Sequence, residues 1–239
     1  MISRESPADR VRRFFSGTGT TYDRIVNLCT LEFDRLWKQK ILRAIPEESI
    51  RILDQACGTG ILTLKIARRF PQARIVGVDL TDEYLGVARK KAAVLGLNHL
   101  EFIPGRAEEV RPDLIFDCIT SSYLAKYADL ERLVDNLKHL LRDGGILIIH
   151  DFTYPANPVF ARIWLVYFKL LQTLGTWKYP QWKTVFDELP GFLRETQWTR
   201  ELVLSLQKNG FSEITLTSLT WGTSAIVTAR KDRNFPGGR

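Results

Sequence analysis

The sequence predicts an α/β fold in which helices flank a doubly wound, mostly parallel sheet of seven strands. Three observations lead to this prediction. The apolar run at residues 50–54 ends in an acid and a glycine turn, and a helical segment then leads to a second apolar run at residues 73–80. The same alternation of apolar runs and amphipathic segments continues to residue 152. Finally, residues 214–217 and 221–229 alternate in polarity like two antiparallel strands.

The elements between these landmarks follow from spacing and from their caps. Helical spacing with polar caps and glycine stops covers residues 61–70, 82–97 and 129–141. Continuous apolar runs predict further strands at residues 100–103, 114–121 and 146–152. Because open parallel sheets bind ligands at the carboxyl ends of their strands, we expect one active edge that carries the glycine turn, Asp79, Arg106, Ser121 and Ser122.

Two segments lie outside this framework. Residues 22–45 are predicted as a helical prelude, and residues 159–174 as an apolar helix that contains Phe160, Trp164 and Phe168. We expect both to cover the active edge. The chain is then one domain, residues 1–239, divided into an N-terminal helical cover (1–48), a ligand-binding core (49–154), a helical lid (155–200) and a C-terminal helix with two strands (201–230).

Composition limits the class of protein. The 239 residues are 45% hydrophobic and carry a net charge of +7, with Lys and Arg scattered along the chain, which favours a solvated surface over a nucleic-acid site. Cys29, Cys57 and Cys118 are an odd number without metal-ligand spacing, so we expect neither disulfides nor a metal site. No signal peptide and no apolar run of about 18 residues is found, which predicts a cytoplasmic protein.

The glycine turn predicts a nucleoside ligand. Gly58 and Gly60 allow the backbone to approach a ligand closely, and Asp79 ends the next strand, where a carboxylate binds ribose hydroxyls. A dinucleotide site would need a third glycine, but Thr63 stands there, and Asp54 would repel a pyrophosphate. S-adenosylmethionine has no phosphate and carries an ammonium and a sulfonium. A carboxylate beside the turn therefore favours this cofactor over NAD.

Several longer motifs extend this interpretation. They are Tyr22-Asp23 followed by Leu36-Trp37-Lys38, the loop at residues 54–60, Val78-Asp79, residues 105–108, residues 116–120, residues 141–145, and Asp151-Phe152-Thr153 before Pro155. Through them, from about residue 22 to residue 231, the chain resembles the class I methyltransferases, and among these the C-methyltransferases of ubiquinone and menaquinone biosynthesis. The resemblance implies a Rossmann-like fold and transfer of a methyl group from S-adenosylmethionine to a carbon of a quinol or a related lipophilic aromatic.

The resemblance also implies a set of cofactor-binding residues. Asp79 would bind the ribose, the Ala107 N–H would bind adenine, and Asp54 would shape the amino-acid pocket. The full set is Asp54, Ala56, Gly58, Thr59, Gly60, Asp79, Leu80, Arg106, Ala107 and Ser122. Arg106 departs from the pattern, because many relatives have Asp or Asn there to accept a hydrogen bond from the adenine amino group, and an arginine has only donors.

Other departures concern the acceptor. Asp34 occupies the place of a histidine, and Ala125-Lys126 stands where the family has Arg-Asn in a loop one residue longer. Attack by an aromatic carbon needs a base near the ring hydroxyl. The candidates are Tyr22, Asp34 and His150, with Lys126 suited to orienting an oxyanion. Their alternatives are ordinary ones: core packing for Tyr22 and His150, and pairing with Arg35 or Lys38 for Asp34.

Other functions stay open at this point. An O- or N-methyltransferase of another small molecule is one alternative, and a non-catalytic or altered-cofactor member of the fold is another, which Arg106 favours. A nucleic-acid methyltransferase is disfavoured, because Thr120-Ser121-Ser122-Tyr123 replaces the element of Asp or Asn, two prolines and an aromatic residue that such enzymes use on a base amine. A peripheral contact of residues 159–174 with an anionic membrane, and a homodimer, are further hypotheses.

Overall fold

The structure, a computed structural model, describes residues 5–97 and 99–233; the two ends of the predicted domain, residues 1–4 and 234–239, lie outside the described residues. Within the described part, seven strands form one sheet in the order β3-β2-β1-β4-β5-β7-β6. They are β1 (Arg51–Gln55), β2 (Arg74–Asp79), β3 (Leu100–Pro104), β4 (Phe116–Ser122), β5 (Leu141–Phe152), β6 (Phe211–Leu219) and β7 (Ser224–Lys231). The strands β1 to β5 pair in parallel, and β7 runs antiparallel to β5 and β6, which confirms the predicted fold class.

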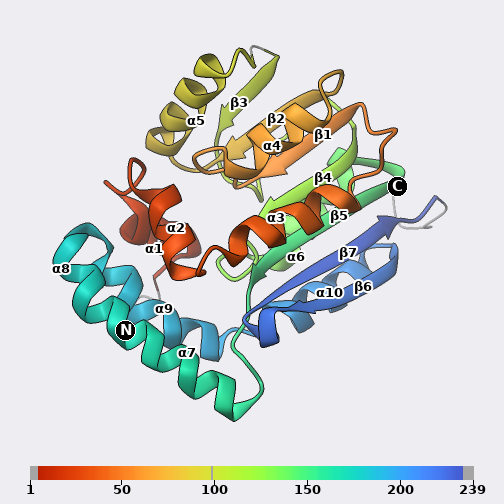
Figure 1. Ribbon diagram of the computed structural model, residues 1–239. Coiled ribbons are helices and arrows are strands. Elements are labelled where there is room, and N and C mark those ends of the chain that lie inside the picture. The colour runs from red at the N-terminus through yellow and green to blue at the C-terminus, as the bar shows by residue number, and fades with distance from the viewer. Residues whose placement is uncertain (1–4, 98, 234–239) are drawn as a thin grey trace.

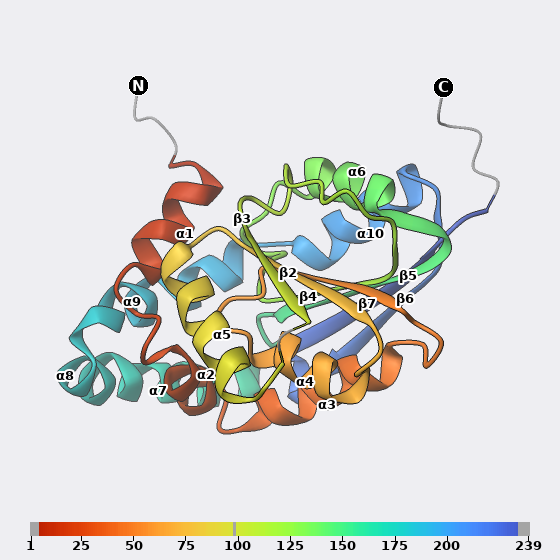
Figure 2. The same cartoon turned by 90° about the horizontal axis from the view of Figure 1, so that it is seen from above.

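Helices cover both faces of this sheet (Figures 1 and 2). One face carries α3 (Phe33–Ala44), α4 (Ile61–Arg69) and α5 (Asp82–Val94), and the other carries α6 (Leu130–Leu140) and α10 (Trp198–Lys208). Successive residues of a strand point to opposite faces. In β1, Ile52 therefore belongs to the core under α3 and α4, and Leu53 to the core under α6 and α10.

A second group of helices gathers beyond one end of the sheet (Figures 1 and 2). It has its own apolar cluster, which includes Phe14, Ile25, Phe168 and Phe186. Arg13 joins the first and last of these helices through Glu188, at 2.6 Å. The group comprises α1 (Pro7–Phe15), α2 (Tyr22–Cys29), α7 (Pro158–Leu170), η1 (Leu171–Gly175), α8 (Thr176–Lys178), η2 (Pro180–Trp182) and α9 (Lys183–Glu195).

The predicted helical prelude is divided into two helices, α2 and α3. Leu31 and Glu32 between them have positive φ angles of 49° and 67°, which lie outside the right-handed α-helical region. The Thr30 hydroxyl bonds to both ends of the break, since it donates to the Val26 carbonyl at 2.8 Å and accepts from the Asp34 N–H at 3.3 Å. The hydrophobic period does not change at Thr30-Leu31-Glu32, so this corner could not be predicted from the sequence.

The last strand, predicted at residues 221–229, does not begin at Trp221, so this expected bound was wrong. This residue lies in the short helix η3 (Thr220–Gly222) with a φ of 55°, and β7 begins only at Ser224. Its indole stacks on Phe160 of α7 at 5.4 Å, a contact between distant segments that alternation within one strand cannot predict.

The strand β5 is longer than expected. It begins at Leu141, before Gly144 and Gly145, whereas the sequence predicts a start at residue 146. The pairing of β4 with β5 shifts register between Phe116 and Cys118, and this irregularity accommodates the two glycines.

Candidate active site

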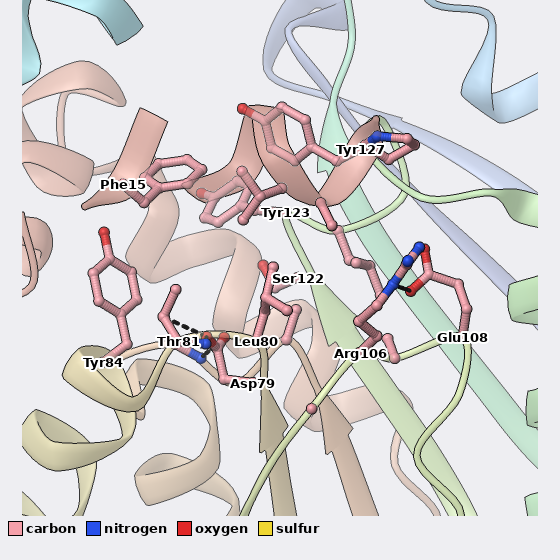
Figure 3. A pocket seen from close by; sticks show the side chains of 18 of the residues that line it. Phe15, Asp79, Leu80, Thr81, Tyr84, Arg106, Glu108, Ser122, Tyr123 and Tyr127 are labelled. Carbon is pink, nitrogen blue, oxygen red and sulfur yellow. Dashed lines mark hydrogen bonds and ion pairs between the residues drawn. The ribbon is translucent and has the colours of Figure 1, made fainter. Parts of the chain in front are cut away.

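A cleft lies at the carboxyl ends of the parallel strands, beneath the N-terminal helices (Figure 3). With its open mouth it encloses about 770 Å³. A narrower pocket beside it reaches Asp54 and Lys38, and both spaces are lined by Tyr22, Ala56, Gly58, Ser122 and Tyr123. The shared lining makes them one continuous site. The larger cleft also contains Asp79, Leu80, Arg106 and Ala107 in its wall.

The turn after β1 has the predicted tight conformation. Ala56, Gly58 and Gly60 have φ angles of 53°, 57° and 82°. A Cβ added at Gly58 would meet only the Tyr84 ring, at 3.7 Å, so the glycine leaves open space inside the cleft. Thr59 lies behind the turn, where its hydroxyl donates to Asp23 at 2.5 Å, and Gly60 is the N-cap residue of α4. These two predicted site residues support the turn and are not part of the cleft lining.

Asp79 ends β2 at the floor of the cleft. Its carboxylate accepts the Gly58 N–H at 2.8 Å and the Thr81 N–H and hydroxyl at 3.0 and 2.7 Å. Burial raises the pKa of Asp79, and these three hydrogen bonds act in the opposite direction. Each carboxylate oxygen can accept more than one hydrogen bond, so the group still has room for a ligand's hydroxyls.

Asp54 lies at the narrow end of the site and is almost fully buried. The hydroxyls of Thr63 and Thr120 donate to its two oxygens at 2.6 and 2.8 Å. Burial raises the pKa of Asp54 to about 6, because two neutral donors compensate only part of the desolvation of the charge. A ligand cation placed beside it would favour the ionised form.

The turn after β3 forms the opposite end of the cleft. Here the Arg106 guanidinium lies between two carboxylates, with Nε 3.7 Å from Glu108 and Nη1 3.5 Å from Glu109 (Figure 3). Ala107 is buried, and its carbonyl accepts a hydrogen bond from Asn136 at 2.8 Å. Arg106 and Ala107 thus lie where the sequence predicts them, and Glu108 joins them in the lining.

A buried polar network begins at the end of β4. Tyr123 has a φ of 71°, and its hydroxyl donates to Asp34 at 2.5 Å. Asp34 also accepts from Lys38 at 2.9 Å, and Lys38 donates to Ser122 at 2.6 Å. Asp34 and Lys38 are nearly inaccessible to solvent, with 1% and 3% of their side chains exposed. Tyr123 is therefore the member of the Tyr123–Asp34 pair that lines the cleft.

His150 and Lys126 lie behind this network. Both ring nitrogens of His150 are used, since Nδ1 lies 2.8 Å from the Ser122 hydroxyl and Nε2 lies 2.7 Å from that of Ser224. Burial lowers the pKa of His150 well below its ordinary value. Lys126 donates to Asp151 at 2.6 Å and to the Tyr123 carbonyl at 3.1 Å. Neither residue is in the lining, so each contacts the cleft through another residue.

Tyr22 is the candidate catalytic residue that lines both parts of the site. Its ring is 5.0 Å from that of Tyr84 and 5.9 Å from that of Trp182. Sequence reasoning missed Phe15, Tyr84, Glu108 and Tyr123. Two signals were available: an aromatic residue two positions after the strand predicted at residues 114–121, and an amphipathic segment at residues 7–15 that Ser6 precedes and Pro7 begins.

Comparison with known proteins identifies the family. The sequence model of the ubiE/COQ5 methyltransferase family matches residues 3–231. The chain belongs to this family. It is an S-adenosylmethionine-dependent methyltransferase, as the glycine turn and Asp79 predicted.

Relatives match along nearly the whole chain. The demethylmenaquinone methyltransferase of Staphylococcus aureus (strain JH9) is 23% identical over 238 residues, 98% of each chain. The enzyme of the same name from Chlorobaculum parvum is 28% identical over 228 residues, 92% of each chain. A methyltransferase structure from Aquifex aeolicus has a TM-score of 0.58 and 15% identity, and covers 81% of this chain and 88% of that chain. This last likeness concerns the fold alone.

Proposed function

We propose that this methyltransferase transfers a methyl group to a ring carbon of a quinol. Two relatives that match along nearly the whole chain are named demethylmenaquinone methyltransferase, which supports a quinone-type acceptor. The observation that carries the proposal from the structure is the Tyr123–Asp34 pair, which offers a proton acceptor at the wall of the cleft. A phenolic ring carbon becomes a good nucleophile when its hydroxyl loses a proton. The pair supplies what C-methylation of a quinol needs.

The residues of the cleft fit the cofactor. Asp79 would bind the ribose hydroxyls, Asp54 would face the ammonium group, and the residues after β3 would surround the adenine. The open space at Gly58 and the remaining acceptor capacity of Asp79 support this assignment. When bound, the cofactor supplies the methyl group as an electrophilic sulfonium. Because its leaving group is neutral, alignment and exclusion of water matter more than acid catalysis.

The proton route uses this chain's own groups. The acceptor hydroxyl gives its proton to Tyr123 Oη as the Tyr123 proton passes to Asp34, over a distance of 2.5 Å. Lys38, 2.9 Å from Asp34, stabilises the carboxylate before transfer. The methylated carbon then gives its own proton to a water molecule, which restores aromaticity. The proton on Asp34 returns through Tyr123 to the ring oxygen, so one proton is released to solvent per turnover. Tyr22 closes the acceptor side of the site.

His150 and Lys126 act as positioning residues in this proposal. His150 holds the Ser122 hydroxyl, which accepts from Lys38, and Lys126 holds the Tyr123 backbone. This is a different role from the direct contact with the acceptor that residue type alone suggests.

The acceptor's lipophilic character gives α7 a role. An apolar pocket outside the cleft is lined by Trp37, Phe152, Ile163, Trp164 and Trp221, and Phe152 stacks on Tyr123 at 4.6 Å. We propose that α7 rests on a membrane surface beside this pocket and receives the acceptor there. The contact proposed here is a peripheral one. Among residues 5–97 and 99–233, no helix has the length and apolarity to cross a bilayer.

The test is product analysis with purified protein. Demethylmenaquinol and labelled S-adenosylmethionine are incubated together, and the product is examined by mass spectrometry and NMR for a new carbon-bound methyl group. Calorimetric binding of S-adenosylhomocysteine is measured in parallel. Cofactor binding without a carbon-methylated product would overturn the quinol proposal, and an oxygen-bound methyl group would replace it with O-methylation.

A further inference from the structure

The adenine end of the cleft lacks the acid or amide that the family resemblance leads one to expect. Arg106 stands at that position, and a guanidinium cannot accept a hydrogen bond from the adenine amino group. Its charge is directed to Glu108 and Glu109, at 3.7 and 3.5 Å. The site therefore needs another acceptor if it is to recognise adenine by its amino group.

Glu108 has the properties of that acceptor. Its side chain is 7% exposed and lines the cleft together with Arg106 and Ala107 (Figure 3). Its contacts are weak: the Asp129 N–H reaches Oε1 at 3.4 Å, and Arg106 Nε lies 3.7 Å from Oε2, beyond hydrogen-bond distance. A carboxylate has about four lone-pair sites, so Glu108 retains acceptor capacity toward the cleft.

Glu109 gives a contrast within the same turn. It also pairs with Arg106, and it accepts from Arg132 at 3.2 Å. Its side chain is 48% exposed, and it is not part of the cleft lining. Both neighbouring carboxylates therefore offset the positive charge of Arg106, but of the two only Glu108 lines the cleft, where it can contact a ligand.

We propose that Glu108 accepts the hydrogen bond of the adenine 6-amino group, with Arg106 as its counter-ion. In this chain the hydrogen-bond acceptor for adenine lies at position 108 and not at position 106, two residues further along the turn. Arg106 neutralises the charge of the Glu108 carboxylate. The inference depends on the S-adenosylmethionine cofactor of the family and is independent of the methyl acceptor. A ligand with a 6-oxo group would place an oxygen against the carboxylate and lose affinity.

The test compares two ligands by calorimetry, S-adenosylhomocysteine and S-inosylhomocysteine, which differ by the 6-amino and 6-oxo groups. The wild-type protein should prefer the amino ligand. In Glu108→Gln the side-chain amide can donate to the 6-oxo group, so the preference should fall by about 10- to 100-fold, the worth of one hydrogen bond to a charged group. Glu109→Gln is the matched control and should keep the wild-type preference.

Two further outcomes decide the proposal. In the double variant Arg106→Asp with Glu108→Gln, the acid returns to position 106 and the preference for the amino ligand should recover at least in part. An equal loss of both ligands in Glu108→Gln, with an unchanged ratio, would overturn the proposal and give Glu108 a purely structural role. Thermal melting of each variant shows that it is folded before binding is compared.

Discussion

At the scale of single residues, the site combines buried carboxylates with few compensating charges. Asp54 has only hydroxyl donors, whereas Asp34 has an ammonium and a phenol. The carboxylates of Asp54 and Asp34 are chemically identical, so their different surroundings give them different roles. Asp54 suits attraction of a ligand cation. Asp34, beside the Lys38 ammonium, accepts the hydrogen bond along which Tyr123 would pass its proton.

Binding of S-adenosylhomocysteine should depend on pH through Asp54. Burial raises the pKa of this carboxyl to about 6, so below pH 6 the free protein carries it protonated, and the ligand's ammonium must displace the proton. Affinity should therefore rise with pH by up to about tenfold per unit until about pH 6, and then level off. Calorimetry between pH 5 and pH 8 measures this.

The control is 5′-methylthioadenosine, which lacks the amino-acid part. It should show a flatter pH dependence below pH 6, because any contribution from Asp79 is common to both ligands. Asp54→Asn should remove the difference between the ligands. If both ligands followed the same curve in the wild type, Asp54 would not be facing the ammonium.

Tyr123→Phe should slow methyl transfer by about 100-fold, the lower range for a lost general base. The ring and its stacking on Phe152 at 4.6 Å remain, and only the hydroxyl that reaches Asp34 is removed. Affinity for S-adenosylhomocysteine should stay within about threefold, since the cofactor contacts are unchanged. Single-turnover kinetics and calorimetry provide the two measurements.

Tyr127→Phe is the matched variant, because Tyr127 also lines the cleft but stacks on Phe192. It should retain nearly the wild-type rate. A Tyr123→Phe protein as fast as Tyr127→Phe would show that the phenol takes no part in the proton transfer.

At the scale of elements, the loop after β4 depends on one buried ion pair with β5. The Lys126 ammonium and Asp151 carboxylate lie 2.6 Å apart, with 2% and 0% of their side chains exposed. The Lys126 N–H also donates to Asp151, at 3.0 Å. Burial lowers the pKa of Lys126, and the adjacent Asp151 carboxylate acts in the opposite direction. The pair thereby fixes the backbone that presents Tyr123.

Asp151→Asn should reduce the free energy of unfolding by about 3–5 kcal/mol, because it leaves the buried Lys126 without a counter-charge. Glu131→Gln is the comparison, since its pair with Lys208 is 74% and 70% exposed and should contribute less than about 1 kcal/mol. Urea unfolding measures both. Similar small losses in the two variants would mean that water reaches Lys126.

At the scale of the whole molecule, one surface differs from the rest. Exposed apolar side chains follow one face of α7 and its extension: Val159, Ile163, Val166, Leu170, Leu174 and Trp177, each more than half exposed. The same stretch, residues 152–186, contains Arg162, Lys169, Lys178 and Lys183 but no Asp or Glu. An apolar stripe with only basic charges around it suits an anionic lipid surface.

We expect flotation of the protein with vesicles of phosphatidylglycerol and less with phosphatidylcholine. Replacing Ile163, Val166 and Leu170 by Gln should lower the bound fraction about fivefold, because about half to two thirds of each side chain is exposed for contact. Val94→Gln with Leu95→Gln, exposed at the C-terminal end of α5, is the control. Equal flotation of both variants would exclude α7 as the contact surface.

Much of this molecule follows from local pattern. The sheet, the glycine turn and the positions of Asp54, Asp79, Arg106 and Ala107 in the site were all predictable, because strand periodicity and turn chemistry act over a few residues. The corner at Leu31 was not, because the sequence there shows no change of period. The turn at Trp221 was not, since its indole is held by a contact with the distant segment α7. The placement of Lys126 against Asp151 has the same origin.

The sequence by itself therefore determined the fold class, the cofactor and the edge of the sheet at which it binds. Only the tertiary structure decided which polar residues line the cleft and how they are paired. Asp34 approaches Tyr123 across 89 positions of chain, and Glu108 lies beside Arg106 in the cleft wall. The physical reason is that a carboxylate's role depends on its burial and its neighbours, and both are set by the packing of segments that are far apart in the chain.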